Sequence, residues 1–385
     1  MILQYKGKKD EALIFEHIKD CSLVLKGGMK GSASKLIKGD NMEVMNILIN
    51  KMGLKGQIDL VYIDPPFATS NVFRLSDGKA NSISRSTDGI IAYDDSLVGE
   101  EYLEFLRERL ILLRELLSKK GSIYLHIDYK IGHYVKVLMD EVFGEEHFIN
   151  DITRTKCNPK NFERRAYGNI KDLILFYSKT DDYIWNEQRI GLTEYDISKR
   201  FAKMEKDGRR YTTIPVHAPG ETKEGPTGQP WRGVLPPKGR HWRSDPKVLD
   251  ELDAAGLIEW SRTGVPRKKI YANESKGMKI QDIWKFKDPQ YPEYPTEKNL
   301  ELLKQIIRTS SNEESLVLDA FCGSGTTLKA AQELGRDWIG IDKSDAAIES
   351  CLKKIKIEEE NLFSGGQKYE YLEEVLIEKS ETQTF

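Results

Sequence analysis

The stretch SLVLDAFCGSGTTLKAAQELGRDWIGID (315–342) decides the fold of this chain. Its apolar residues at 315–321 predict a buried strand, and the glycines that follow predict a tight turn into a helix over 326–335. The residues RDWIGID (336–342) then predict a second strand. A strand, a helix and a strand in this order form the unit from which α/β proteins with parallel sheets are built.

The same alternation occurs in the first part of the chain. QIDLVYI (57–63) is a short apolar run that stops before two prolines, which is typical of a buried strand. In EYLEFLRERLILLRELLSKKG (101–121) the leucines recur at the spacing of one helix face. We therefore expect one sheet built from both ends of the chain, with an inserted region between them. Further elements are predicted as a strand over 121–128 and helices over 134–144, 299–311 and 345–361.

The inserted region differs in amino-acid composition and charge from the rest of the chain. Residues 199–243 carry eleven Lys and Arg against four Asp and Glu, and they include Trp231 and Trp242. The formal net charge of the whole chain is −2, so the positive charge is a property of this region. The predicted organisation is an N-terminal arm (1–35), one half of the sheet domain (36–150), the inserted region (151–290), the other half (291–361) and a peripheral C-terminal tail (362–385).

Length and composition exclude several protein classes. Hydrophobic residues make up 39% of the 385 positions, which is enough for a core and excludes wholesale disorder. No run approaches the roughly 18 consecutive apolar residues of a transmembrane helix, and the charged N-terminus does not resemble a signal peptide. The cysteines form no CxxC pair and the histidines show no metal-ligand spacing. We therefore expect no catalytic metal, no membrane partner and a cytoplasmic location.

The glycine turn and the strand after it indicate a nucleoside cofactor. Gly323 and Gly325 let the backbone approach a ligand closely and expose amides at the start of a helix. Asp342 ends the next predicted strand, where a carboxylate suits the two hydroxyls of a ribose. Neither GxGxxG nor GxxxxGK[ST] is present, which disfavours NAD and ATP. A turn that serves packing alone is the alternative.

The tetrapeptide Asp64-Pro65-Pro66-Phe67 follows the other buried strand. In open α/β sheets, ligands bind at the carboxyl ends of the strands. A carboxylate and a backbone carbonyl can accept both hydrogens of an exocyclic amino group, and Phe67 can stack on the ring that carries it. This segment therefore predicts a receptor for a flat aromatic amine. A strand-terminating turn with a buried Phe is the structural alternative.

Together these residues resemble the amino-group DNA methyltransferases that use S-adenosylmethionine. In that family, [Asp/Asn/Ser]-Pro-Pro-[Tyr/Phe/Trp] is the catalytic signature and Phe-x-Gly-x-Gly is the cofactor signature. DPPF (64–67) and FCGSG (321–325) match both, and their order is that of the β class. The segments GDNMEVMNIL (39–48) and YPTEKNLELLKQII (294–307) match further family elements, and 240–261 resembles site-specific, type III-like adenine methylases. The departures are Phe67 for the commoner Tyr, with Ala320 and Asn299 in place of prolines.

The resemblance implies a Rossmann-like methyltransferase sheet with helices on both faces, plus an inserted target-recognition domain at 151–290. The catalytic half then spans 36–150 and the cofactor-binding half 291–361. It further implies transfer of a methyl group to the N6 amine of a flipped adenine. Asp40 has a helix N-cap as its alternative role, and Lys298 a solvated helix charge. The implied catalytic residues are Asp64, Pro65, Pro66 and Phe67, and the implied cofactor-binding residues are Asp40, Thr296, Lys298, Asp319, Phe321, Gly323, Gly325, Thr326 and Asp342.

The partner implied by the resemblance is double-stranded DNA, which places the protein at the nucleoid. A cognate restriction endonuclease and a homodimer are both compatible with the sequence. Open alternatives are N4-cytosine methylation on the same fold, methylation of RNA or of a protein glutamine, and a DNA-binding subunit with a dead site. Each DNA-binding candidate could instead be a surface charge, a structural cation or a core tryptophan. The candidates are Arg154, Lys156, Arg164, Arg165, Arg232, Arg240, Trp242 and Arg243.

Overall fold

The computed structural model describes residues 2–66, 71–76, 79–80, 90–95, 97, 99–159, 161, 163, 165–290, 292, 294, 297–359 and 369–377. Among the predicted site residues, Phe67, Arg164 and Thr296 lie outside this set. The internal contacts divide the chain into two compact units. The larger unit comprises Met1–Gln188 and Gln281–Phe385, and the smaller is an insertion of Arg189–Ile280.

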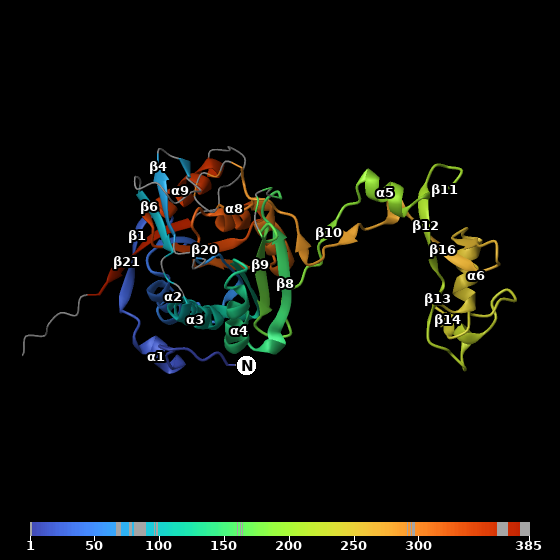
Figure 1. Ribbon diagram of the computed structural model, residues 1–385, viewed down its shortest axis with the longest axis horizontal. Coiled ribbons are helices and arrows are strands. Elements are labelled where there is room, and N and C mark those ends of the chain that lie inside the picture. Colours follow the sequence, from blue (N-terminus) through green and yellow to red (C-terminus); the bar gives the residue numbers. More distant parts are fainter. Residues whose placement is uncertain are drawn as a thin grey trace, which may run out of the picture. The chain divides into compact units, whose positions relative to one another are not determined.

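The larger unit is built around a central sheet, which has ten strands among the described residues (Figure 1). Six neighbouring strands are parallel to one another: β21, β2, β20, β19, β3 and β7. In order across the sheet, the strands are β1 (Cys21–Gly28), β21 (Tyr369–Leu376), β2 (Ser34–Lys38), β20 (Asp337–Asp342), β19 (Leu316–Asp319), β3 (Ile58–Ile63), β7 (Leu117–Ile127), β9 (Lys171–Ser178), β8 (Phe148–Thr155) and β18 (Ile283–Trp284).

Helices cover both faces of this sheet, as the sequence predicts for an α/β fold (Figure 1). Helices α2, α3 and α4 pack together on one face, where the leucines of α3 are fully buried in the main core. Helices α7, α8 and α9 pack on the other face. The helices of this unit are α1 (Glu11–Glu16), α2 (Asn41–Asn50), α3 (Gly99–Leu116), α4 (Gly132–Phe143), the 3-10 turn η1 (Glu145–His147), α7 (Leu300–Ser310), α8 (Thr326–Glu333) and α9 (Asp345–Glu359).

The centre of the sheet contains a topological switch point. Strands β3 and β19 are parallel neighbours, with Leu60 opposite Val317 and Val61 opposite Leu318. From β3 the chain continues through α3 to β7 on one side, and from β19 it continues through α8 to β20 on the other. Because the two connections leave in opposite directions, a crevice opens where both strands end. The two sequence motifs follow these two strands.

Both chain ends differ from the sequence-based prediction. The N-terminal arm contains β1, and the tail expected to be peripheral contains β21, which lies between β1 and β2 in the central sheet. The described residues between β3 and α3 include three short strands of a separate sheet. These are β4 (Asn71–Ser76), β5 (Lys79–Ala80) and β6 (Ile90–Asp95).

The insertion has a small core of its own, formed by Val216, Trp231, Trp242, Leu249 and Ile258. As a compact unit it is narrower than the predicted 151–290, because β8, β9 and β18 pair within the central sheet. Its elements are β10 (Arg189–Ile190), α5 (Glu194–Arg200), β11 (Lys203–Met204), β12 (Arg210–Pro215), β13 (His217–Pro219), η2 (Pro226–Gly228), β14 (Arg240–Trp242), α6 (Pro246–Ala254), β15 (Ile258–Trp260), β16 (Pro266–Tyr271), η3 (Ala272–Glu274) and β17 (Met278–Lys279).

Candidate active site

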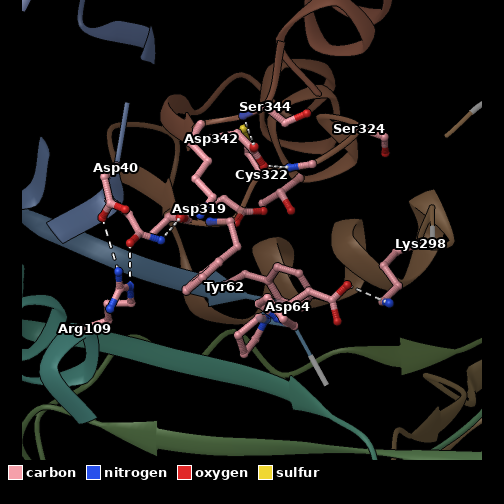
Figure 2. Close-up of a pocket in the computed structure, with 18 of the residues that line it drawn as sticks. Asp40, Tyr62, Asp64, Arg109, Lys298, Asp319, Cys322, Ser324, Asp342 and Ser344 are labelled. Carbon is pink, nitrogen blue, oxygen red and sulfur yellow. Dashed lines mark hydrogen bonds and ion pairs between the residues drawn. The ribbon is translucent and has the colours of Figure 1, made fainter. Parts of the chain in front are cut away.

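A single continuous cavity joins the two sequence motifs at the switch point (Figure 2). Its walls include residues 64–66 after β3, residues 320–324 after β19 and residues 342–344 after β20. Residues 39–41, at the start of α2, complete the side next to β20. The carboxyl ends of three parallel strands thus converge on one space, which is the arrangement that binds ligands in open α/β sheets.

The glycine turn has a backbone conformation that favours glycine at two positions, and at Gly325 it has no room for a side chain. Gly323 and Gly325 have φ of +46° and +78°, in the left-handed region that other residues rarely adopt. A Cβ atom on Gly325 would lie 2.8 Å from Sγ and 3.2 Å from Cα of Cys351. Helix α8 begins at the next residue, Thr326, so the turn presents the amino end of a helix to the cavity.

Asp342 connects the ends of β19 and β20. Its Oδ2 accepts the N–H of Gly323 at 3.0 Å, and its Oδ1 accepts the N–H of Ser344 at 2.9 Å. Burial raises the pKa of Asp342, and these amide hydrogen bonds and Lys343 oppose the shift. The carboxylate is therefore held in one orientation at the cavity wall, where the sequence predicts a partner for ribose hydroxyls.

Asp319 lies between the two motifs and is buried, with 2% of its surface exposed. Burial raises its pKa to about 7, against hydrogen bonds from Thr327 and the N–H of Phe321, while the charges of Asp64 and Asp342 raise it further. Asp319 is therefore a carboxyl group that changes charge near neutral pH, at the point where the motifs meet.

Asp40 has the helix-capping role that the sequence offered as an alternative, and it also faces the cavity. Its Oδ1 caps α2 by accepting the N–H of Met42 at 3.0 Å. Arg109 Nη2 lies 3.2 Å from the same oxygen, and Arg109 Nε donates to Asn41 Oδ1 at 2.6 Å (Figure 2). Burial favours a higher pKa for Asp40, but Arg109 and the Met42 amide outweigh it and the pKa is lowered. Sequence reasoning missed Arg109, although it stands among leucines on the apolar face of α3.

The catalytic carboxylate predicted at Asp64 has two neighbours that face it. Lys298 Nζ lies 2.7 Å from Asp64 Oδ2, and His126 Nδ1 lies 4.0 Å from Asp64 Oδ1 (Figure 2 shows Lys298 facing Asp64). The alternative of a solvated charge is wrong for Lys298, because only 9% of its surface is exposed. Asn299, which replaces the family proline, caps α7 by accepting the N–H groups of Glu301 and Leu302.

Behind Asp64 lies a buried polar chain that the sequence analysis did not include. Tyr62 OH is 2.9 Å from His126 Nδ1, and His126 Nε2 is 3.2 Å from Asp172 Oδ2. Lys156 Nζ donates to Asp172 Oδ1 at 2.5 Å. The pKa of His126 is lowered, first because of burial, so the imidazole is neutral at pH 7. A histidine inside the apolar run SIYLHID is the sequence signal that could have indicated this chain.

Several predicted DNA-binding residues have structural roles instead. Arg154 is fully buried, where it pairs with Asp172 and Asp288. Trp242 is 1% exposed in the core of the insertion, and its Nε1 donates to the carbonyl of Gln229 at 2.9 Å. These two are corrections to the sequence-based prediction, because buried side chains do not contact DNA.

The remaining candidates keep part of their surface in solvent. Arg232 is exposed but pairs with Asp250 and Asp253 of α6, and Lys156 is half-buried beside Asp172. Arg165, Arg240 and Arg243 are exposed.

Two further features concern metals and membranes. In the described part of the chain, no cluster of His, Cys, Asp and Glu could hold a metal ion. None of the helices described is long and apolar enough to cross a membrane.

Comparison with known proteins identifies the family to which this chain belongs. A family model named N6_N4_Mtase and described as DNA methylase matches residues 58–353. The chain belongs to this DNA methylase family. The match runs from β3, which leads to Asp64, through the insertion and both motifs, and into α9. DNA methyl transfer is therefore the activity class of this chain, and the family expected from the sequence is confirmed.

A similar sequence agrees with this membership. The methylase is 41% identical over 364 residues to "Type II methyltransferase M.EcaI" of Enterobacter cloacae. This alignment covers 92% of this chain and 77% of that protein. The methylase is 27% identical to the "Type III restriction-modification enzyme StyLTI Mod subunit" of Salmonella typhimurium, over 80% of this chain and about half (51%) of that protein. Among solved structures, the M1.HpyAVI-SAM complex matches with a TM-score of 0.43 and 17% identity, over 83% of this chain and 99% of that chain.

Proposed function

We propose that this DNA methylase transfers a methyl group from S-adenosylmethionine to the N6 amine of an adenine in double-stranded DNA. The observation that carries the proposal is the single cavity lined by Asp64 and Pro65 on one side and by the glycine turn and Asp342 on the other. An acceptor for an amine and a cradle for a nucleoside thus share one space. Asp at the first position of the tetrapeptide favours adenine over cytosine, by the resemblance given above.

The cofactor fits the described residues of the cradle. Gly323 lines the cavity without a side chain, so a ligand can approach the backbone of the turn there, whereas Gly325 packs against Cys351. Asp342 is fixed beside the turn by two amides, with lone pairs left for hydroxyl groups. When bound, S-adenosylmethionine supplies an electrophilic methyl group on a sulfonium. We assign its cradle to Phe321, Gly323, Gly325, Thr326 and Asp342, with Asp40 and Asp319 at its border.

The chain's own residues orient the amine. The lone pair of an exocyclic amine is delocalised into the base, so the nitrogen is a weak nucleophile. Hydrogen bonds accepted by Asp64 and by the Pro65 carbonyl favour a pyramidal nitrogen, and the lone pair then points away from them toward the glycine turn. The nitrogen gains a carbon and releases one proton, and the Asp64 carboxylate is the base in contact with it.

The target base must leave the double helix to enter this cavity. A base within a duplex is stacked and paired, so its amine cannot approach Asp64. We assign ring stacking to Phe67 from the sequence. The insertion 189–280, with Arg240 and Arg243 exposed on it, is the proposed target-recognition domain. The names of the relatives further support a place in a restriction-modification system.

Analysis of the product tests the proposal. The protein is incubated with radiolabelled S-adenosylmethionine and duplex DNA, and the DNA is digested to nucleosides and separated by chromatography. Label in N6-methyladenosine is the expected result. Label in N4-methylcytosine would move the assignment to cytosine, and DNA without label would contradict the proposed function.

A further inference from the structure

The two oxygens of the Asp64 carboxylate have different surroundings. Oδ2 lies 2.7 Å from the ammonium of Lys298. Oδ1 is buried and accepts no hydrogen bond from any residue that the structure describes. A buried carboxylate oxygen is costly without a donor, and polar atoms of this kind concentrate at functional sites. Oδ1 is therefore the oxygen of this carboxylate that has unused hydrogen-bonding capacity.

Lys298 is held in place by more than its charge. It is 9% exposed and directly precedes Asn299, whose side chain accepts the N–H groups of Glu301 and Leu302. The Asn299 amide also donates to the carbonyl of Lys287 at 2.9 Å. The backbone at the start of α7 is thus fixed on both sides of the cap. A lysine with so little freedom can hold a carboxylate oxygen in one position.

Among the described residues near Asp64, the titratable groups of His126, Asp319 and Tyr62 do not supply a cation. His126 on β7 is neutral, because burial lowers its pKa, and its ring nitrogens are engaged by Tyr62 and Asp172. Asp319 on β19 is a carboxyl group, and its pKa is raised to about 7 by burial and partly by the charge of Asp64. Tyr62 on β3 is a phenol, whose pKa burial raises well above its usual value. Lys298 is therefore the group that balances the charge of Asp64.

We propose that Lys298 is a positioning residue for Asp64, rather than part of the cofactor cradle to which the sequence assigned it. It binds Oδ2, which leaves Oδ1 for the hydrogen of the target amine. This inference rests on the proposed function, because it requires an amine at Oδ1. It predicts that loss of the ammonium impairs the reaction while cofactor binding persists.

The test compares Lys298→Met with Lys298→Arg and a matched control, Lys304→Met. Lys304 lies on α7, which begins two residues after Lys298, and it pairs with Glu301 and Glu333 and does not line the cavity. Calorimetry measures the affinity for S-adenosylmethionine, and single-turnover assays measure methyl transfer across pH. We expect Lys298→Met to bind the cofactor like the wild type but to react about 100-fold more slowly at neutral pH. Lys298→Arg should recover part of the rate, and Lys304→Met should retain it.

The pH profile separates positioning from a merely structural role. A carboxylate that loses a neighbouring cation has a higher pKa, so the acidic limb of the rate should move to higher pH in Lys298→Met. An unchanged limb and rate would overturn the inference. A lowered cofactor affinity with a normal saturated rate would also overturn it and would return Lys298 to the cofactor cradle.

A double-mutant cycle covers the case in which Lys298→Met folds poorly. If Lys298 acts through Asp64, then Lys298→Gln should slow an Asp64→Asn enzyme no further. Additive losses would contradict the inference. A wild-type protein that methylates no DNA would instead refute the proposed function, so the two failures are distinguishable.

Discussion

The cavity and the insertion use charge in different ways. In the cavity two carboxylates pair with buried cations, Asp64 with Lys298 and Asp40 with Arg109. In the insertion, Arg240, Arg243 and Arg267 surround His217, and no carboxylate among the described residues lies within ion-pair distance of them. Buried pairs fix atoms for chemistry, whereas free cations attract a polyanion from a distance. We propose from this difference that the reaction takes place in the cavity and that the insertion contributes DNA affinity.

The largest effect is expected from a substitution that changes only the cavity. Asp64→Ala removes the acceptor of the amine, and we expect methyl transfer to fall by about 10³-fold or more. S-adenosylmethionine should still bind, because the glycine turn and Asp342 are unchanged. Single-turnover assays and calorimetric titration measure the two quantities. Normal turnover by this variant would reject the role of Asp64.

A second change affects only the insertion. Trp242 is buried against Trp231, and Trp242→Ala should destabilise the insertion by about 3–5 kcal/mol. Limited proteolysis should then cut within 189–280 while cofactor binding persists. Trp260→Ala is the matched control, because that side chain is 37% exposed and should cost less. Equal protease resistance of Trp242→Ala and wild type would show that Trp242 is not a core residue.

A third prediction sharpens the contrast between buried and exposed charge. The pKa of Asp319 is raised from 3.8 to about 7, chiefly by burial. Between these values the unfolded chain is ionised while the folded one is protonated, so stability should decrease as pH rises through this window. The slope is at most about 1.4 kcal/mol per pH unit. Asp319→Asn should flatten this slope in urea unfolding measured across the window, and an unchanged slope would show that another group titrates.

The smallest expected effect concerns the exposed cations. Replacing Arg240 or Arg243 by Gln should weaken DNA binding roughly tenfold. The slope of the logarithm of the binding constant against the logarithm of the salt concentration should become shallower, by about 0.9 for each phosphate that the variant no longer neutralises. Cofactor affinity should not change. Fluorescence anisotropy with labelled duplex at several salt concentrations measures the slope. Arg232→Gln is the control, because Arg232 already pairs with Asp250 and Asp253. Identical slopes for all variants would place the DNA-binding surface elsewhere.

The sequence predicted the parts of the site that depend on local pattern. Apolar runs and the residues that end them located β3 and β19, and the glycines located the turn before α8. Because the carboxyl ends of parallel strands meet at one edge, the convergence of Asp64 and Gly323 on one cavity could be expected from the chain order alone.

The missed parts depend on contacts that are distant in sequence. Lys298 and Asp64 are far apart in the chain, and nothing local indicates that they form a pair. Strand β21 was taken for a peripheral tail because its charged residues resemble solvent-exposed sequence, yet it pairs with β1 and β2. Arg154 was assigned to DNA because it is basic, but its burial beside Asp172 is a tertiary property.

The central claim is that the Asp64 corner and the glycine turn form one pocket that methylates a base in DNA. The most direct measurement is sequencing of host DNA, with detection of modified bases, after expression of the wild-type protein or of Asp64→Ala. The account predicts N6-methyladenine at one recurring short sequence with the wild type and none with the variant. Unmodified DNA with the wild type, or equal modification with both, would contradict it.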